Sequence, residues 1–276
     1  MFSFLICLAL LIGGYFVYGG IVEKTFGPDD RETPAVKIND GVDYVVLPQW
    51  KLFMIQLLNI AGVGPVFGPI MGALYGPAAL LWIVLGSIFA GAVHDYFSGM
   101  LSVRYNGANV PEIVGYNLGK IAQWVMRVFA VLLLLLVGVV FATAPAGLLA
   151  KLTPEWLDFK VWLGVIFFYY FLATIVPIDK IIGKIYPIFG VALILMALAL
   201  LGVLLFGPYR IPELTTLTNA QLDPHSVPIV PTLFITIACG AISGFHATQS
   251  PLMARCVRNE RECRSVFFGA MISESI

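Results

Sequence analysis

Four ionisable side chains lie inside stretches of this sequence that are otherwise apolar: His94, Asp95, His246 and Glu274. Ionisable groups are costly in a hydrophobic segment, and those that occur there form proton relays, ion paths or substrate sites. The adjacent His94 and Asp95 suit a proton relay or a gate in which the carboxylate orients the imidazole ring. The alternative is that Asp95 reaches an interface and His94 bonds a backbone carbonyl. Glu274 suits a buried proton carrier, so we expect His94, Asp95 and Glu274 to couple a proton to the function.

His246 has polar neighbours that the other three residues lack. Thr248, Gln249 and Ser250 follow it, ahead of Pro251. A histidine among hydroxyl and amide groups suits the binding of a substrate carboxylate, or proton coupling. The alternative is a packed histidine that donates to a loop carbonyl.

Other sequence patterns argue against metal and enzyme chemistry. The four cysteines, at positions 7, 239, 256 and 263, are scattered and no matching histidine pair accompanies them, so neither a disulfide framework nor a zinc site is indicated. His94 and Asp95 alone are too weak a pattern for a metal site. The sequence contains neither His-Glu-x-x-His nor Gly-x-Ser-x-Gly, which argues against a membrane-embedded hydrolase. We expect no cofactor, no metal and no enzymatic activity.

Glycine and proline interrupt two apolar segments at their middles, residues 52–76 and 229–254. An interrupted helix leaves backbone groups unpaired, which hydrocarbon tolerates only where the break lines a protein-walled cavity. Paired breaks of this kind point to the binding site of a secondary transporter, although close helix packing through Gly-x-x-x-Gly pairs is the alternative. The residues that we expect to bind substrate are Gly62, Gly64, Pro65, Gly68, Gly240, Ser243, Gly244, His246 and Gln249.

The composition is that of a membrane protein. Hydrophobic residues make up 59% of the 276 residues and charged residues 12%, against about 25% charged in a soluble domain. The formal net charge is zero, so no basic surface indicates nucleic acid. We expect an all-α polytopic protein with seven transmembrane helices, two of them broken, and the start of an eighth near Ser265. The predicted spans are residues 2–22, 52–76, 78–100, 124–149, 161–177, 186–206 and 229–254. The first is counted as a retained span because no positive charge precedes it.

The lysines and arginines set the expected orientation. If every segment crosses once, thirteen of the sixteen basic residues fall on one side, which is then cytoplasmic and places the N-terminus outside. If residues 52–76 did not cross, the split would be nine against seven. Residues 23–51 then form a cytoplasmic loop. The two broken segments run in opposite directions with four spans between them, which predicts an inverted repeat of five helices each.

Several stretches resemble the carbon starvation protein A (CstA) family. They are residues 38–44 (INDGVDY), 60–69 (IAGVGPVFGP), 85–96 (LGSIFAGAVHDY), 243–246 (SGFH) and 269–275 (GAMISES). The resemblance implies a bacterial or archaeal inner-membrane carrier related to amino acid–polyamine–cation transporters. It also implies uptake of peptides or pyruvate during carbon starvation, with protons. Family members continue well past Ile276, so we expect one transmembrane domain, residues 1–276, that is truncated within a span.

The expected function is therefore a secondary transporter, a proton symporter for peptides or pyruvate-like carboxylates. Its expected partners are the lipid bilayer, the substrate, H⁺ or Na⁺, and a missing C-terminal half or a second copy. The positive ends of interrupted helices attract a carboxylate, but they do not distinguish pyruvate from a peptide. The alternatives are a non-transporting membrane fragment or subunit with a sensory or structural role and, less favoured, an intramembrane hydrolase.

Overall fold

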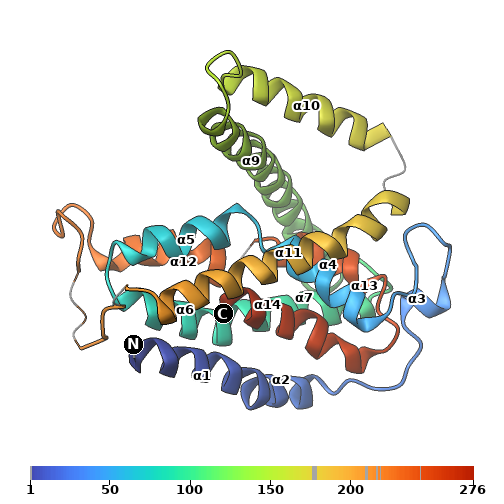
Figure 1. Cartoon of the computed structure of the whole chain (residues 1–276). Helices are drawn as coiled ribbons and strands as arrows, with labels where there is room; N and C mark the ends of the chain where they lie inside the picture. Colours follow the sequence, from blue (N-terminus) through green and yellow to red (C-terminus); the bar gives the residue numbers. More distant parts are fainter. Residues whose placement is uncertain (1, 176–178, 209–210, 216, 218, 243) are drawn as a thin grey trace. The chain divides into compact units, whose positions relative to one another are not determined.

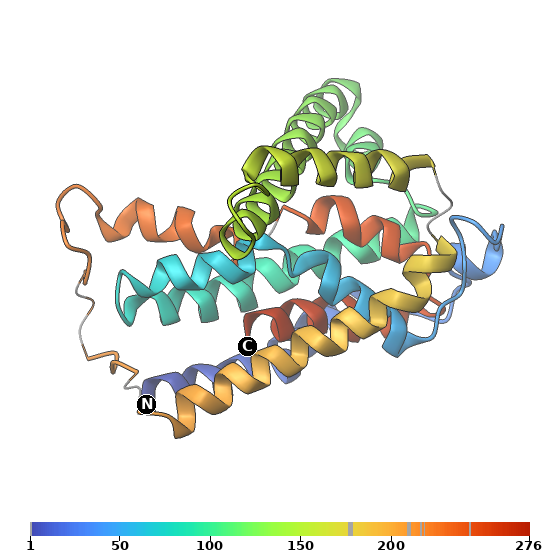
Figure 2. The same ribbon diagram turned by 45° about the horizontal axis from the view of Figure 1, so that its top comes forward.

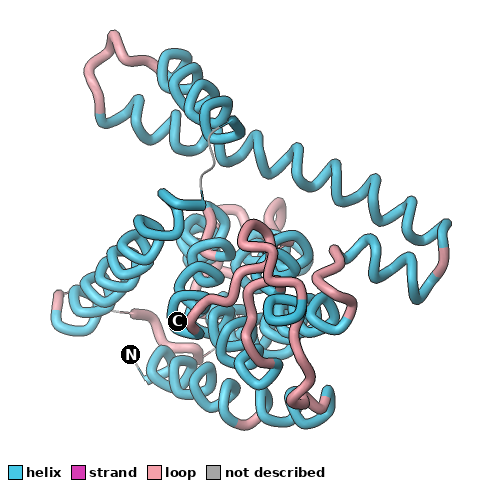
Figure 3. Tube along the Cα trace, turned by 90° about the vertical axis from the view of Figure 1, so that its right-hand side faces the viewer, coloured by secondary structure: helices cyan, strands magenta, loops and turns pink. Residues whose placement is uncertain are grey.

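The computed structural model describes residues 2–175, 179–208, 211–215, 217, 219–242 and 244–276, and no strand occurs among them (Figure 3). The prediction of an all-helical protein is thereby confirmed. The chain divides into two compact units, one of residues 1–113 and 186–276 and the other of residues 114–185. For several residues inside these ranges, including Pro65 and Gly240, the structure describes the backbone but not the surroundings of the side chain.

Within the described part of the chain, four helices are long and apolar enough to cross a membrane: Phe2–Phe26, Ala78–Arg104, Lys120–Leu152 and Ile188–Phe206. They coincide with four of the predicted spans. The first comprises α1 (Phe2–Phe16) and α2 (Tyr18–Phe26), and the second comprises α6 (Ala78–Gly86), a π-helical turn η1 (Ser87–Gly91) and α7 (Ala92–Arg104). The count of seven spans stays a prediction.

Both predicted interruptions are present in the larger unit. Helix α4 (Gln49–Ile60) ends at Ala61, and α5 (Val63–Ala73) begins after Gly62, whose extended backbone separates the two helices. Pro65 falls in the first turn of α5, where a missing N–H leaves no helical hydrogen bond unmade. The break therefore precedes the prolines.

The second interruption follows a short helix. A π-helical turn η2 (Ile229–Leu233) leads into α12 (Phe234–Ala241), which ends at Ile242, and α13 (His246–Ala254) begins after Phe245. Ser243, which we expected to bind substrate, lies outside the described residues. The chain thus leaves the helical conformation between Ala241 and His246, as the sequence predicted.

The two interrupted segments lie against each other. Helix α5 packs on α12, and α4 packs on α13, so the segments run antiparallel (Figures 1 and 2). A Cβ atom on Gly68 would lie 3.3 Å from the carbonyl oxygen of Thr236, and one on Gly72 would lie 2.9 Å from Cδ1 of Ile237. Gly68 and Gly72 therefore let α5 approach α12 closely, which is the packing role that the sequence offered as an alternative.

The apolar core of the larger unit lies around α7. Tyr96 and Met100 of α7 are buried against Phe267 and Phe268 of η4 (Arg264–Phe268), and α14 (Gly269–Ser275) continues from η4. A Cβ atom on Gly99 would lie 2.4 Å from Cε2 of Phe267, so the glycine admits the ring. Two short helices, α3 (Pro34–Lys37) and η3 (Glu260–Glu262), lie in the loops.

The smaller unit is built on two packed helices, α9 (Lys120–Leu152) and α10 (Phe159–Ile175). The hydroxyl of Tyr170 donates to the carbonyl oxygen of Phe141 at 3.1 Å, and the indole N–H of Trp162 donates to the hydroxyl of Thr153 at 2.9 Å. The unit also takes in the end of α8 (Val110–Leu118) and the start of α11 (Asp179–Phe206). Large apolar side chains are exposed all along α9, as lipid contact requires.

The close approach of η1 to α12 generates a stability prediction. A Cβ atom on Gly91 would lie 2.1 Å from the carbonyl oxygen of Ala241, so Gly91→Ala must push the last turn of α12 away. We expect a loss of about 1–3 kcal/mol in the free energy of unfolding, measured by thermal denaturation in detergent. Gly13→Ala is the control, because nothing lies within 4 Å of its added Cβ atom. Equal stability of the two variants would contradict this packing.

Candidate functional site

Three buried polar residues join the two interrupted segments to α7. The side-chain amide nitrogen of Gln56 (α4) lies 2.9 and 3.1 Å from the two carboxyl oxygens of Asp95 (α7) and 3.0 Å from the hydroxyl of Ser250 (α13). The Ser250 hydroxyl in turn donates to Asp95. All three residues have an exposed fraction of 0%. Gln56 lies one turn before the first break and Ser250 one turn after the second, so we call Gln56, Asp95 and Ser250 the polar clasp.

Two histidines lie in contact next to the clasp. The rings of His94 (α7) and His246, the first residue of α13, have centroids 5.3 Å apart and cross at 69°. His246 is fully buried and neither of its ring nitrogens has a hydrogen-bond partner, and Nδ1 of His94 has none. The fold therefore brings together three of the ionisable residues that the sequence singled out, from positions about 150 apart.

The Asp95 carboxyl group has no cationic partner among the described residues. The ion pairs recorded there use Glu23, Asp29, Asp30 and Glu260 instead. An ionised carboxylate that is buried without a counter-ion costs several kcal/mol, even when hydrogen bonds meet part of that cost. The clasp is thus a place where a proton or another small cation is favoured.

Glu274 lies near the clasp on α14. Neither of its carboxyl oxygens has a hydrogen-bond partner, and its carboxyl group lies within electrostatic range of Asp95. Glu274 also lines a cavity of about 510 Å³, a volume typical of small-molecule sites. Among the described residues that line the cavity, the ionisable side chains are the carboxyl group of Glu274 and the thiol of Cys7.

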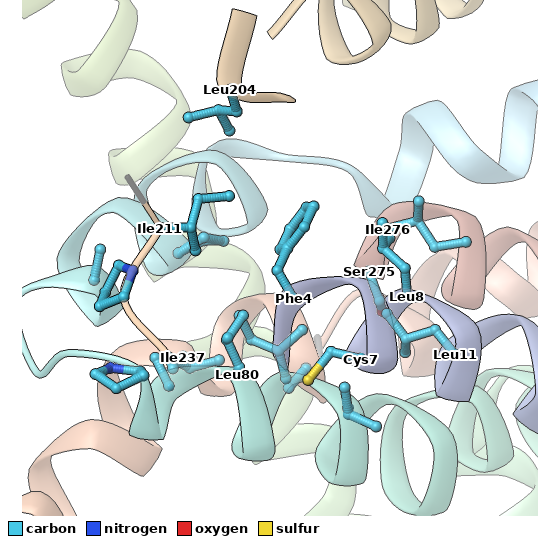
Figure 4. A pocket seen from close by; sticks show the side chains of 18 of the residues that line it. Phe4, Cys7, Leu8, Leu11, Leu80, Leu204, Ile211, Ile237, Ser275 and Ile276 are labelled. Atoms are coloured by element: carbon cyan, nitrogen blue, oxygen red, sulfur yellow. The ribbon is translucent and has the colours of Figure 1, made fainter. Parts of the chain in front are cut away.

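The cavity walls are mostly apolar (Figure 4). Phe4, Cys7 and Leu11 of α1 face Leu80 of α6 and Ile237 of α12. The interrupted segments contribute Pro69 and Ala241 as well. The described lining does not include Gly62, Gly64, Gly68, Gly244, His246 or Gln249. Their role in substrate binding stays a prediction, as does that of Ser243, Pro65 and Gly240.

Ionic contacts tie the loops together at the other end of the unit, where α2 and α7 finish. Glu260 is fully buried, and its carboxylate accepts from the guanidinium of Arg104 at 3.2 and 3.1 Å and from the backbone N–H of Asp29 at 3.1 Å. The hydroxyl of Thr33 donates to the carbonyl oxygen of Val257 at 2.6 Å. We call these contacts between residues 27–33, Arg104 and residues 257–260 the ionic strap.

Arginines around the strap form ion pairs and hydrogen bonds with nearby residues. The guanidinium of Arg31 donates to both carboxyl oxygens of Asp29, which holds the pKa of that carboxyl well below its usual range. Arg264 pairs with Glu23 at 2.7 Å, and Arg255 donates to the carbonyl oxygen of Gly107 at 3.0 Å. Part of the predicted loop 23–51 is thus fixed to the segment that follows α13.

Sequence reasoning missed Gln56 and Glu260. Gln56 is uncharged and therefore did not stand out among ionisable residues, but an amide one turn before a predicted break was a usable signal. Glu260 lies in a strongly charged loop, and the sequence alone does not distinguish a buried acidic residue there from its exposed charged neighbours.

The family model of carbon starvation protein CstA matches residues 1–161 and 152–276. An uncharacterized membrane protein of Haemophilus influenzae is 45% identical, over 100% of this chain and 88% of its own length. The peptide transporter CstA of Escherichia coli is 27% identical over 98% of this chain and 47% of its own. The pyruvate/proton symporter BtsT of Escherichia coli is 29% identical over 89% and 43%. The chain therefore spans about half the length of these transporters. No solved structure matches it.

The ionic strap generates a second stability prediction. Glu260→Gln leaves the guanidinium of Arg104 without its buried carboxylate, and we expect a loss of about 3 kcal/mol in the free energy of unfolding. Arg261→Gln is the matched control, since Arg261 and Asp30 form a pair whose side chains are 64% and 70% exposed. Its loss should stay below about 1 kcal/mol. Thermal unfolding in detergent, followed by tryptophan fluorescence, measures both; similar losses would mean that Glu260 does not hold the strap.

Proposed function

Because the chain belongs to the carbon starvation protein CstA family, we propose that it forms part of a secondary active transporter that takes up a small carboxylate with protons. The observation that supports this most is the antiparallel packing of two interrupted helices with a buried polar clasp between them. Interrupted helices at a repeat interface are the usual construction of substrate and ion sites in secondary transporters. Relatives named as a peptide transporter and as a pyruvate/proton symporter point the same way.

The proposed substrate is pyruvate or a short peptide. Both present a carboxylate, and the free N–H groups at the start of α5 and of α13 favour an anion. His246 begins α13 and has two ring nitrogens available for hydrogen bonds. The residues that we propose for substrate binding are those predicted at the breaks: Gly62, Gly64, Pro65, Gly68, Gly240, Ser243, Gly244, His246 and Gln249.

The proposed coupling ion is H⁺. His94, Asp95 and Glu274 are its proposed carriers, because all three have polar atoms in the buried interior near the breaks. We further propose a multi-pass protein of the inner membrane with its N-terminus outside, as the distribution of lysine and arginine favours. The two breaks would belong to corresponding helices of an inverted repeat of the amino acid–polyamine–cation type.

A second candidate function is a membrane subunit that does not transport by itself. The chain spans 47% of the length of the Escherichia coli peptide transporter, so the test below also supplies the remaining half. Such a subunit would need the remaining part of a transporter, or a second copy, for uptake.

Uptake by whole cells tests the proposal. Labelled pyruvate and a labelled dipeptide are supplied to cells that express this chain, alone or joined to the C-terminal half of the Escherichia coli peptide transporter, with and without a protonophore. We expect uptake of one of the two substrates, and we expect the protonophore to abolish that uptake. His246→Ala should lower it about tenfold, because the loss of a hydrogen bond to the substrate costs about 1.4 kcal/mol of binding free energy.

The control is His225→Ala, because His225 is exposed in the loop before η2. It should transport as the unchanged chain does. Uptake only by the joined protein would favour the subunit, whereas no uptake by either form would refute the transport proposal.

A further inference from the structure

We propose that the polar clasp is the proton site that couples the two interrupted helices: Asp95 binds the proton, and Gln56 and Ser250 are positioning residues for its carboxyl group. This inference rests on the proposed function and deepens it, because it selects one carrier among three candidates. It also gives roles to two residues, Gln56 and Ser250, whose contacts with Asp95 only the fold reveals.

The clasp connects both interrupted segments to α7. Gln56 belongs to α4, before the first break, and Ser250 belongs to α13, after the second. Asp95 lies on α7, which packs on α13. A change at the Asp95 carboxyl group therefore acts on both interrupted segments at once, whereas the ring contact of His94 is with His246 of the second segment.

The clasp contains both donors and an acceptor for the Asp95 carboxyl group. With Asp95 ionised, the Gln56 amide and the Ser250 hydroxyl both donate to its oxygens. The Gln56 carbonyl oxygen Oε1 is buried and has no hydrogen-bond partner. A protonated Asp95 has one O–H to donate, and Gln56 Oε1 can accept it after a rotation of the amide. The clasp can thus satisfy the carboxyl group in both protonation states.

The proton step itself is simple. Asp95 takes H⁺ from water on one side of the membrane, its carboxylate becomes a carboxylic acid, and the reverse step releases H⁺ on the other side. No bond other than O–H forms or breaks. Protonation removes the cost of a buried charge but replaces an acceptor with a donor, so the hydrogen bonds that hold α4 and α13 to α7 must rearrange.

The charged and titratable groups around Asp95 leave it without a competing cation. His94 is its neighbour on α7, α13 contributes His246, and α14 contributes Glu274. Two other elements that pack on α7 carry charged residues: η4 has Arg264, and α2 has Glu23 and Lys24. Arg264 pairs with Glu23. Helix α4 has Lys51 in its first turn and no ionisable residue from Leu52 to Ile60.

Two transport assays in proteoliposomes distinguish an effect on proton binding from an effect on substrate binding. They use the form of the chain, alone or joined, that takes up substrate in cells. One measures accumulation driven by a pH gradient, and the other measures exchange of labelled for unlabelled substrate without a gradient. Asp95→Asn keeps the shape but cannot release a proton. We expect its accumulation ratio to fall to about 1, the value without coupling, while exchange continues.

The positioning residues are tested by the pH profile. Ser250→Ala and Gln56→Leu each remove a hydrogen bond to the ionised carboxylate of Asp95. A loss of about 1.4 kcal/mol of stabilisation of that form should shift the pH midpoint of uptake by about one unit. Ser250→Thr, which keeps the hydroxyl, should restore the original midpoint. Asp223→Asn and Gln221→Leu, in the loop before η2, are matched controls that should change neither assay.

The outcomes are distinguishable. Accumulation by Asp95→Asn equal to that of the unchanged chain would overturn the inference and leave the transport proposal standing. Absence of both accumulation and exchange in the unchanged chain would refute the transport proposal instead. If Asp95→Asn does not fold, an unshifted pH midpoint in Ser250→Ala and Gln56→Leu overturns the inference, and a shifted midpoint that Ser250→Thr restores supports it.

Discussion

The packing of α5 on α12 and of α4 on α13 determines how the rest of the larger unit is arranged. A chain that leaves the helical conformation inside an apolar protein exposes N–H and C=O groups that lipid cannot pair, so it needs protein on every side. The second interrupted segment lies beside the first, and Gly68 and Gly72 of α5 allow the close approach to α12. The polar clasp and the histidine contact lie along this pairing, so Gln56, Asp95, Ser250 and the two histidines come together in one buried region.

Much of this arrangement could be predicted from the sequence. The positions of both breaks and of four long apolar helices follow from glycine, proline and hydrophobic runs, because these act locally. The selection of His94, Asp95 and His246 followed from the cost of ionisable groups in apolar segments. The partners of Asp95 could not be predicted, because Gln56 and Ser250 are 39 and 155 residues away and local patterns do not encode such contacts. The first break also precedes Pro65, since a proline in the first turn starts a helix rather than ending one.

The apolar cavity and the buried polar residues are separate in the larger unit. The cavity of about 510 Å³ is lined mainly by aliphatic side chains of α1, α6 and α12, whereas the clasp and the histidines are packed away from it. Glu274 is the residue that belongs to both surroundings, because it lines the cavity and lies within electrostatic range of Asp95. A solute in the cavity would therefore meet mainly apolar side chains, together with the carboxyl group of Glu274, the hydroxyl of Ser275 and the thiol of Cys7.

The ionic strap joins parts of the larger unit that are far apart in the sequence. It lies where α2 and α7 finish, while the cavity lies near the starts of α1 and α6. The hydrogen bond from Asp29 to Glu260 spans 231 positions of the chain, and that from Thr33 to Val257 spans 224. Residues 27–33 and 257–260 can therefore separate only if these contacts break. The strap thus acts as a noncovalent cross-link between the first and the last part of the larger unit.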